Sequence, residues 1–164
     1  MITSQTKLTA VIGNPIRHSM SPVIHNPIFR DEGVDAVMLA FQHESIAELV
    51  QVIRTLPILF TAVTIPHKQT VMPLLDEISE DARAIGAVNT IINREGKLHG
   101  YNTDITGIAA SLKDVELKGK NALLIGAGGV AQPIAYHLSK SGASLFCLNR
   151  ERPMAEALCK KFGG

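Results

Sequence analysis

A threonine and a lysine follow a short apolar run in a pattern that suits ligand binding. The run Phe60–Ile65 is β-branched and apolar and stops at Pro66, which predicts a buried parallel strand. In open α/β sheets, ligands bind just beyond the carboxyl ends of the strands. We therefore expect Thr64 and Lys68 to lie where such a fold does its chemistry. A plain strand end with a solvated lysine explains this segment about equally well.

A second polar cluster lies between a predicted strand that ends at Gly13 and a predicted helix that begins near Pro22. Ser21 is a good N-cap, and Pro22 suits the first helical position. A helix start with hydroxyls nearby favours a carboxylate or a phosphate. Capping alone explains Ser21, whereas Ser19 has no such structural role.

Two further polar residues lie at the ends of predicted strands. Asn89 comes just before one strand, and Asp104 follows another and begins a connecting helix. Their structural alternatives are a turn residue and a plain N-cap. Taken with the serines, the threonine and the lysine, they predict a site for a polyhydroxylated carboxylate.

A glycine-rich segment points to a nucleotide beside that site. Gly126, Gly128 and Ala131 fit G-x-G-x-x-A between a predicted strand and a predicted helix. The first glycine permits a tight turn, the second lets the backbone approach a pyrophosphate, and the helix N-terminus favours the anion. We expect a dinucleotide-binding loop made of Gly126, Ala127, Gly128, Gly129, Val130 and Ala131. The alternative is a strand–helix turn that binds nothing.

The residues after the next predicted strand bear on the choice between NAD and NADP. An acidic residue there would bind a ribose 2′-hydroxyl, whereas an arginine would accept a 2′-phosphate. The sequence places Asn149, Arg150, Glu151 and Arg152 at this position. The two arginines favour NADP, whereas the acidic Glu151 between them does not. Either arginine could instead be a solvated residue at the start of a helix.

Composition limits the class of protein. The chain has 164 residues, 46% hydrophobic content and a net charge of +1 without a basic run, which argues against nucleic acid as a partner. No apolar run reaches the length of a membrane span, and the first residues lack the order of a signal peptide. Cys147 and Cys159 have neither metal spacing nor a disulfide framework. We expect a soluble cytoplasmic protein without a metal.

Strands and helices alternate along the chain, which predicts an α/β fold. An N-terminal α/β substrate domain with a mostly parallel sheet (residues 1–102) is expected to precede a connecting helix and linker (103–120) and an incomplete Rossmann-like domain (121–164). The predicted strands are Leu8–Gly13, Ala36–Gln42, Phe60–Ile65, Thr90–Asn93, Leu98–Asn102, Asn121–Gly126 and Ser144–Asn149. The predicted helices are Pro22–Glu32, Ile46–Leu56, His67–Leu75, Ser79–Ile85, Ile105–Leu112, Val130–Ser141 and Arg152–Phe162.

In this order, the motifs resemble those of the shikimate dehydrogenase family along essentially the whole chain. The matching segments are Gly13-Asn-Pro, Ser19-Met-Ser21-Pro, Val63-Thr-Ile-Pro-His-Lys68, Gly86-Ala-Val-Asn89-Thr, Gly100-Tyr-Asn102-Thr-Asp104 and Gly126-Ala-Gly-Gly129. The resemblance implies NADP-dependent interconversion of 3-dehydroshikimate and shikimate. It implies that Ser19 and Ser21 hold the substrate carboxylate. It also implies that Thr64, Asn89 and Asp104 contact the hydroxyls, and that Lys68 acts with Asp104 at the reacting oxygen.

The chain departs from the family pattern at several positions. Ala62 replaces an asparagine behind the substrate strand, Gln132 stands where an arginine is common, and Glu151 and Met154 replace a hydroxyl residue and a basic one. The largest departure is that only two strands of the nucleotide domain are present.

Three alternatives therefore remain open. One is an NADP-dependent dehydrogenase that is active when paired with a missing segment or a second chain, which leaves the activity of the isolated chain open. Another is a non-catalytic binding module or remnant, and the third is a quinate/shikimate enzyme that uses NAD. The incomplete sheet also predicts an exposed edge and an uncovered apolar face, with Leu123, Leu124, Ile125, Leu145, Phe146 and Leu148 in need of neighbours. A homo-oligomer that forms through this sheet would supply them.

Overall fold

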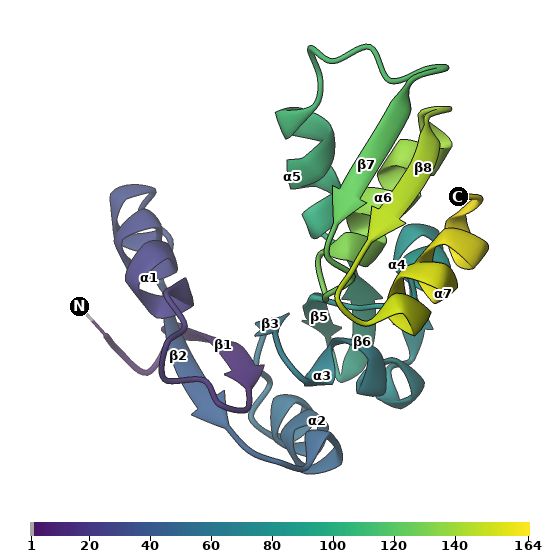
Figure 1. The fold of residues 1–164 in the computed structure, drawn as a ribbon. Coiled ribbons are helices and arrows are strands. Elements are labelled where there is room, and N and C mark those ends of the chain that lie inside the picture. The colour runs from purple at the N-terminus through teal and green to yellow at the C-terminus, as the bar shows by residue number, and fades with distance from the viewer. Residues whose placement is uncertain (1) are drawn as a thin grey trace. The chain divides into compact units, whose positions relative to one another are not determined.

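A computed structural model describes residues 2–164, which form two compact units. Of the described residues, the N-terminal unit comprises 2–83 and Ala87–Tyr101, and the C-terminal unit comprises Ala84–Gly86 and Asn102–Gly164. Each unit has its own hydrophobic core. Figure 1 shows their elements in order. The functional roles assigned to the two domains stay predictions.

The N-terminal unit is built on a six-stranded mixed sheet with the order β2-β1-β3-β5-β6-β4. Its strands are β1 Lys7–Gly13, β2 Ala36–Gln42, β3 Phe60–Val63, β4 Glu77–Ile78, β5 Thr90–Arg94 and β6 Lys97–Tyr101. The pairs β1–β2, β1–β3 and β4–β6 are parallel, and β3–β5 and β5–β6 are antiparallel. The predicted α/β fold with a mostly parallel sheet is confirmed.

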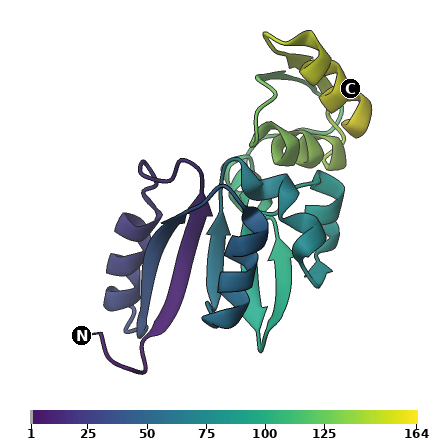
Figure 2. The same ribbon diagram turned by 90° about the horizontal axis from the view of Figure 1, so that it is seen from below.

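The helices of this unit are α1 Ser21–Asp31, α2 Ile46–Thr55, α3 His67–Thr70 and the 3₁₀ turn η1 Met72–Leu74, while α4 Glu80–Ile85 extends across the division between the units. The apolar stripe of α2 packs Leu49, Val50 and Ile53 against Ala10 and Ile12 of β1. Figure 2 shows α2 in front of the sheet and α1 beside β2 at its edge.

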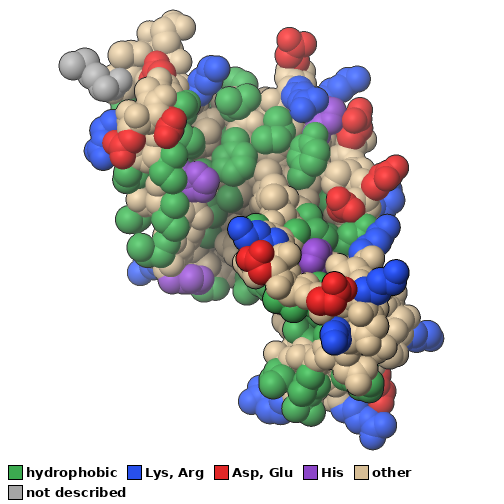
Figure 3. Space-filling model, turned by 90° about the horizontal axis from the view of Figure 1, so that it is seen from above, with side chains coloured by type: hydrophobic (Ala, Val, Ile, Leu, Met, Phe, Trp, Pro, Cys, Tyr) green, Lys and Arg blue, Asp and Glu red, His purple; other side chains and the backbone are tan. Residues whose placement is uncertain are grey.

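Hydrophobic side chains gather on the face of the N-terminal unit opposite α2 (Figure 3). The His25 ring of α1 lies 5.9 Å from the rings of both Phe29 and Phe60, measured between centroids. A cleft of about 330 Å³ opens beside them, and Thr9 and Leu59 also line it. This face of the sheet is therefore covered only in part by the described residues.

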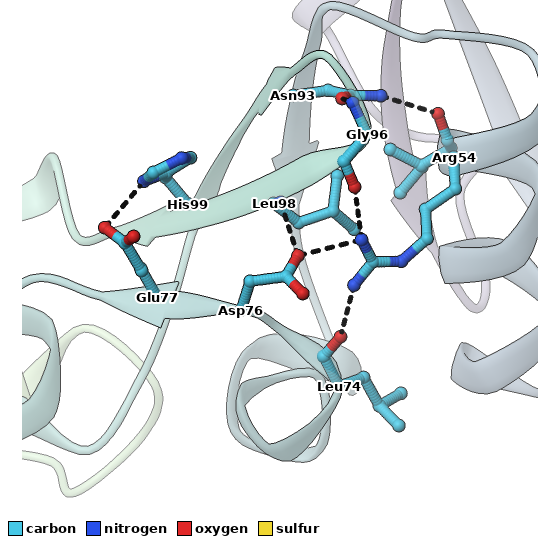
Figure 4. Close-up of polar contacts among 9 residues, drawn as sticks. Arg54, Leu74, Asp76, Glu77, Asn93, Gly96, Leu98 and His99 are labelled. Carbon is cyan, nitrogen blue, oxygen red and sulfur yellow. Dashed lines mark hydrogen bonds and ion pairs between the residues drawn. The ribbon is translucent and has the colours of Figure 1, made fainter.

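A polar cluster joins several elements at the amino end of β3 (Figure 4). Arg54, in the last turn of α2, donates to the Asp76 carboxylate at 2.8 Å, to Leu74 O at 3.2 Å and to Gly96 O. Asp76 also accepts from Leu98 N at 2.6 Å. Because the β5–β6 turn lies at the end of the sheet away from Asn89, this cluster serves the fold and is separate from the polar residues after β3.

The C-terminal unit contains two parallel strands, β7 Asn121–Ile125 and β8 Ser144–Leu148, and three helices, α5 Asp104–Ser111, α6 Ala131–Lys140 and α7 Arg152–Phe162. Leu124 and Leu145 pack with the core residues of α6 and α7. On the other face, Leu123, Ile125, Phe146 and Leu148 are 54–75% exposed. The predicted uncovered apolar face is present, but Leu124 and Leu145 do not belong to it, because side chains alternate along a strand.

Three sequence-based expectations are corrected by the structure. The strand at β3 ends at Val63, and Ile65 is 67% exposed just before a cis peptide bond to Pro66. The short strand β4 was not expected, because two residues give no periodic pattern. The single helix predicted over His67–Leu75 is α3 followed by η1. Among residues 2–164 no helix is long and apolar enough to cross a membrane.

Candidate substrate and cofactor sites

The backbone after β3 places Thr64 and Lys68 at the carboxyl end of that strand. Thr64 N donates to Ile12 O of β1 at 3.0 Å, and His67 N donates to Thr64 O at 2.9 Å. Gly13, the last residue of β1, is packed so closely that a Cβ there would lie 2.6 Å from Thr64 Cγ2. The end of β1 therefore requires glycine so that the segment after β3 can pack against it.

Asn89 lies at the same end of the sheet. Its N–H donates to Tyr101 O at 3.0 Å and its carbonyl accepts from Val63 N at 2.7 Å, so it continues the ladder between β3 and β6. Its side-chain Oδ1 accepts from the Thr90 hydroxyl at 2.9 Å. Val88 N donates to Lys68 O at 2.7 Å. The N-terminal unit thus brings Thr64, Lys68 and Asn89 together at the carboxyl end of β3.

His67 is a buried histidine that the sequence reasoning did not single out. It is 3% exposed, and its ring Nε2 lies 3.0 Å from His43 O. Because a carbonyl only accepts, Nε2 carries the hydrogen. This bond fastens the start of α3, and with it Lys68, to the segment after β2. The available signal was its place between Pro66 and Lys68 in the strand-end motif.

Ser19 and Ser21 are half-buried and adjacent, with their hydroxyl oxygens 3.2 Å apart. The predicted capping role of Ser21 is wrong, since the N-cap is Met20 and makes no side-chain capping bond. The structural role belongs instead to Ser19, whose Oγ accepts from Ser21 N at 3.3 Å. Pro22 lies at the start of the helix as expected.

A buried threonine in β3 has a polar side-chain atom without a partner among the described residues. Thr61 is fully buried, and among the described residues its hydroxyl has no hydrogen-bond partner. Burying an unpaired hydroxyl costs about 1–3 kcal/mol. Thr61 precedes Ala62, the position at which the chain departs from the expected motif.

Asp104 begins α5 in the C-terminal unit. It lies in the first turn, where a carboxylate is favoured by the helix dipole, and its N–H donates to Asn102 Oδ1 at 3.1 Å. Asn102 is 5% exposed. The N-cap position belongs to Thr103, so the plain capping interpretation of Asp104 is wrong. Its carboxylate is therefore not explained by a cap.

The glycine-rich loop has the backbone that its sequence predicts. Gly126 adopts φ +101° and its N–H donates to Leu148 O at 2.7 Å, which joins the end of β7 to the end of β8. A side chain there would be strained. No atom lies within 4 Å of a Cβ built on Gly126, Gly128 or Gly129. Because α6 begins directly afterwards at Ala131, the loop has the openness and the helix start that a pyrophosphate needs.

Gln132 lies in the first turn of α6, where the motif commonly has an arginine. Its Oε1 accepts from Lys161 Nζ at 3.0 Å, and the same ammonium donates to Ile85 O at 2.5 Å. Partial burial lowers the pKa of Lys161. A lysine from α7 thus places a cation beside the start of α6, which could not be found from local sequence because 29 residues separate the pair.

The residues after β8 differ in how their side chains are engaged. Asn149 Nδ2 donates to Glu151 O at 3.0 Å, which shapes the turn, and Arg150 is exposed. Arg152 pairs with Glu156 at 2.7 Å one helical turn away. Glu151 occupies the N-cap position of α7 without a side-chain capping bond. Arg150 is therefore better placed than Arg152 to accept a phosphate.

Two models of known protein families match this chain. The model of the shikimate dehydrogenase substrate binding domain matches residues 11–91, and the model described as shikimate / quinate 5-dehydrogenase matches residues 108–164. The chain belongs to the shikimate dehydrogenase family. The recognition made from the motifs is thereby confirmed.

Relatives in this family match nearly all of the chain. The shikimate dehydrogenase (NADP(+)) of Pyrococcus abyssi is 47% identical over 158 residues, which are 96% of this chain and 59% of that relative. The crystal structure of shikimate dehydrogenase from Aquifex aeolicus matches with a TM-score of 0.94 at 42% identity. This match covers 99% of this chain and 63% of the Aquifex aeolicus chain.

A third similar protein is the shikimate 5-dehydrogenase from Listeria monocytogenes in complex with shikimate and NAD. Its TM-score is 0.90 at 35% identity, over 99% of this chain and 59% of that one. The chain therefore spans about three fifths of the length of these shikimate dehydrogenases. The roles of the individual site residues stay predictions.

Proposed function

We propose that this protein, with the remainder of a shikimate dehydrogenase, reduces 3-dehydroshikimate reversibly to shikimate with NADPH. The observation that carries the proposal is the convergence of Thr64, Lys68 and Asn89 at the carboxyl end of β3, in a chain of this family. Ligands of open α/β sheets bind at that end of the strands. Two hydroxyl-binding side chains beside a lysine suit a polyhydroxylated ketone.

The substrate carboxylate is assigned to Ser19 and Ser21. Their adjacent hydroxyls can both donate to one carboxylate, and the start of α1 adds a favourable dipole. Thr64, Asn89 and Asp104 are assigned to the substrate hydroxyls. These assignments would fix the ring orientation, since a carboxylate at one end and hydroxyls at the other define a direction.

Lys68 and Asp104 are assigned to the reacting oxygen. Reduction of a ketone leaves a developing alkoxide, which an ammonium can stabilise and protonate. A carboxylate near that ammonium would keep it oriented and charged. When bound, the nicotinamide supplies the hydride, so the protein needs only to position and polarise the substrate.

The cofactor is assigned to the loop Gly126–Ala131 and to the turn after β8. The open glycines and the start of α6 fit a pyrophosphate, and exposed Arg150 fits a 2′-phosphate. NADP is also the cofactor in the name of the Pyrococcus abyssi relative. We expect Arg150→Ala to weaken NADP binding about tenfold and to leave NAD binding unchanged, with Arg152→Ala as the matched control.

A steady-state assay of the full-length protein with shikimate and with quinate, each with NADP and with NAD, tests the proposal. Turnover confined to shikimate with NADP supports it. Turnover of quinate with NAD would favour the second candidate, which Glu151 after β8 and the NAD complex of the Listeria relative support. Shikimate binding without turnover of any pair would leave a non-catalytic binding module.

The apolar face of β7–β8 suggests a homo-oligomer as the working form. Leu123, Ile125, Phe146 and Leu148 are too exposed for a finished sheet, and a second copy is one means of covering them. Size-exclusion chromatography of residues 1–164, before and after Phe146→Thr, tests this. A monomer at every concentration would contradict it. We place the activity in the cytoplasm, where cell fractionation would find it.

A further inference from the structure

A side chain of α1 pairs with the backbone of the edge strand β2, as a neighbouring strand would. Among residues 2–164, β2 has β1 as its only strand neighbour, so its other side presents backbone groups. Asn26 of α1 accepts from Met38 N at 2.7 Å and donates to Met38 O at 3.0 Å. One carboxamide thus satisfies both main-chain groups of a buried residue in the middle of the strand.

The same strand also holds the segment before α1. Gln42, the last residue of β2, accepts from Ile16 N at 3.1 Å through its side-chain Oε1. Ile16 is 6% exposed, so this N–H would otherwise be buried without a partner near the chain's first polar cluster. Two amide side chains therefore join β2 to the chain on either side of Ser19 and Ser21.

A series of hydrogen bonds runs through Ser19 and Ser21, between the contact made by Gln42 and the contact made by Asn26. Ser19 N donates to Ile16 O at 2.9 Å, and Ser21 N donates to Ser19 Oγ at 3.3 Å. Ser21 then begins α1, which carries Asn26 in its second turn. The position of both hydroxyls is thus set by contacts that reach β2 in two places.

We propose that Asn26 and Gln42 are positioning residues, which hold the Ser19–Ser21 hydroxyls on the edge of the sheet so that they receive the substrate carboxylate. Neither side chain touches the substrate in this account. The inference rests on the proposed function for the identity of the ligand, but its structural part concerns only the N-terminal unit. It makes the edge strand β2 part of the substrate site.

Shikimate affinity measured by calorimetry on the full-length protein tests the proposal. Asn26→Ala should weaken shikimate binding about tenfold, because two hydrogen bonds are lost, and should leave NADP binding unchanged. Gln42→Ala should weaken it about threefold. Arg30→Ala is the matched control on α1, since its exposed side chain pairs with the neighbouring Asp31. This control should bind shikimate as the unchanged protein does.

A double-mutant cycle separates positioning from general loosening. If Asn26 acts through the serines, Asn26→Ala should weaken binding much less in a Ser19→Ala background than in the unchanged protein. Full additivity would overturn the proposal, as would shikimate affinity within about twofold of the unchanged protein. If Asn26→Ala does not fold, Gln42→Ala is used in the same cycle with the same criteria.

Amide hydrogen exchange keeps the inference separate from the proposed function. Asn26→Ala should accelerate exchange at Met38 and Ser19 and leave Val63, within the β3 ladder, protected. If the unchanged protein does not bind shikimate, the proposed function fails, and the exchange result alone then decides whether Asn26 holds the serine segment. Unchanged exchange at Ser19 would overturn the inference.

Discussion

The two units of this chain fix their polar residues in different ways. In the N-terminal unit, the backbone of Thr64 bonds to β1 and that of Asn89 to β3 and β6. The carbonyl of Lys68 accepts from Val88 N, shortly before β5. In the C-terminal unit, two strands support a loop whose geometry comes from a positive φ at Gly126. A site built on a sheet depends on distant residues, whereas a glycine loop depends mainly on its own backbone.

The same contrast extends to what each unit leaves uncovered. The N-terminal core is closed on the α2 side, and its other face is covered in part by α1. The C-terminal sheet has α6 and α7 on one face and exposed Ile125 and Phe146 on the other. We therefore expect substrate binding to be less sensitive than cofactor binding to changes on the exposed face of β7 and β8.

The largest expected effect concerns the N-terminal unit. Lys68→Ala in the full-length protein should lower kcat about a hundredfold or more, because the developing alkoxide loses its proton donor, while shikimate binding changes far less. Steady-state kinetics and calorimetry measure the two quantities. Lys97→Ala, at the exposed β5–β6 turn, is the control. Near-normal turnover in Lys68→Ala would remove Lys68 from the mechanism.

A substitution in the glycine loop should act on the C-terminal unit alone. Gly126→Ala places a Cβ at φ +101°, so we expect the free energy of unfolding of that unit to fall by about 1–3 kcal/mol and NADP affinity to drop. Shikimate affinity should stay unchanged. Gly107→Ala, inside α5 with no atom within 4 Å of the added Cβ, should instead stabilise the unit by about 0.5–1 kcal/mol.

Thermal unfolding monitored separately in each unit, with ligand titrations, checks this pair of variants. If Gly126→Ala weakened shikimate binding as much as NADP binding, the independence of the two sites would be contradicted.

The unpaired hydroxyl in β3 predicts a gain in stability. Thr61→Val keeps the shape and removes a buried hydroxyl that lacks a partner, so the N-terminal unit should gain about 1 kcal/mol in chemical denaturation. Thr90→Val is the control, since the Thr90 hydroxyl donates to Asn89 and its loss should destabilise. Equal destabilisation by both variants would show that Thr61 has a polar role.

The smallest expected effect is a pH dependence of the N-terminal unit. The Arg54 side chain, with Leu98 N–H, lowers the pKa of Asp76. Because this pKa is lower in the folded state, the Asp76 carboxylate stabilises the fold at pH values above the ordinary pKa of an aspartate, near 3.9. This stabilisation is lost as the pH falls through the pKa of the folded state. Because Asp76 is 40% exposed, the loss should be below about 1 kcal/mol.

Denaturation of the unchanged protein and of Asp76→Asn between neutral pH and pH 3 measures this effect. The unchanged protein should lose more stability than the variant below about pH 4. Parallel pH curves for the two proteins would contradict the assignment.

Much of this molecule was predictable from local patterns. The apolar run before Thr64, the strand that begins at Thr90 and the glycine loop all form as the sequence indicates. Each depends on neighbours within a few residues, so periodicity and backbone preference suffice to find it. The boundaries moved by one or two residues, as at Val63, because strand ends depend on the partner strand.

The family, the order of the elements and the residue types of the two candidate sites could be read from local motifs. Three contacts could not: the bond to Ser19 Oγ, the bonds of Asn26 to Met38, and the bond of Lys161 to Gln132. One cause explains all three. Hydrogen-bond partners are residues that lie close together in space. A local sequence pattern does not show which residue of another element will lie there.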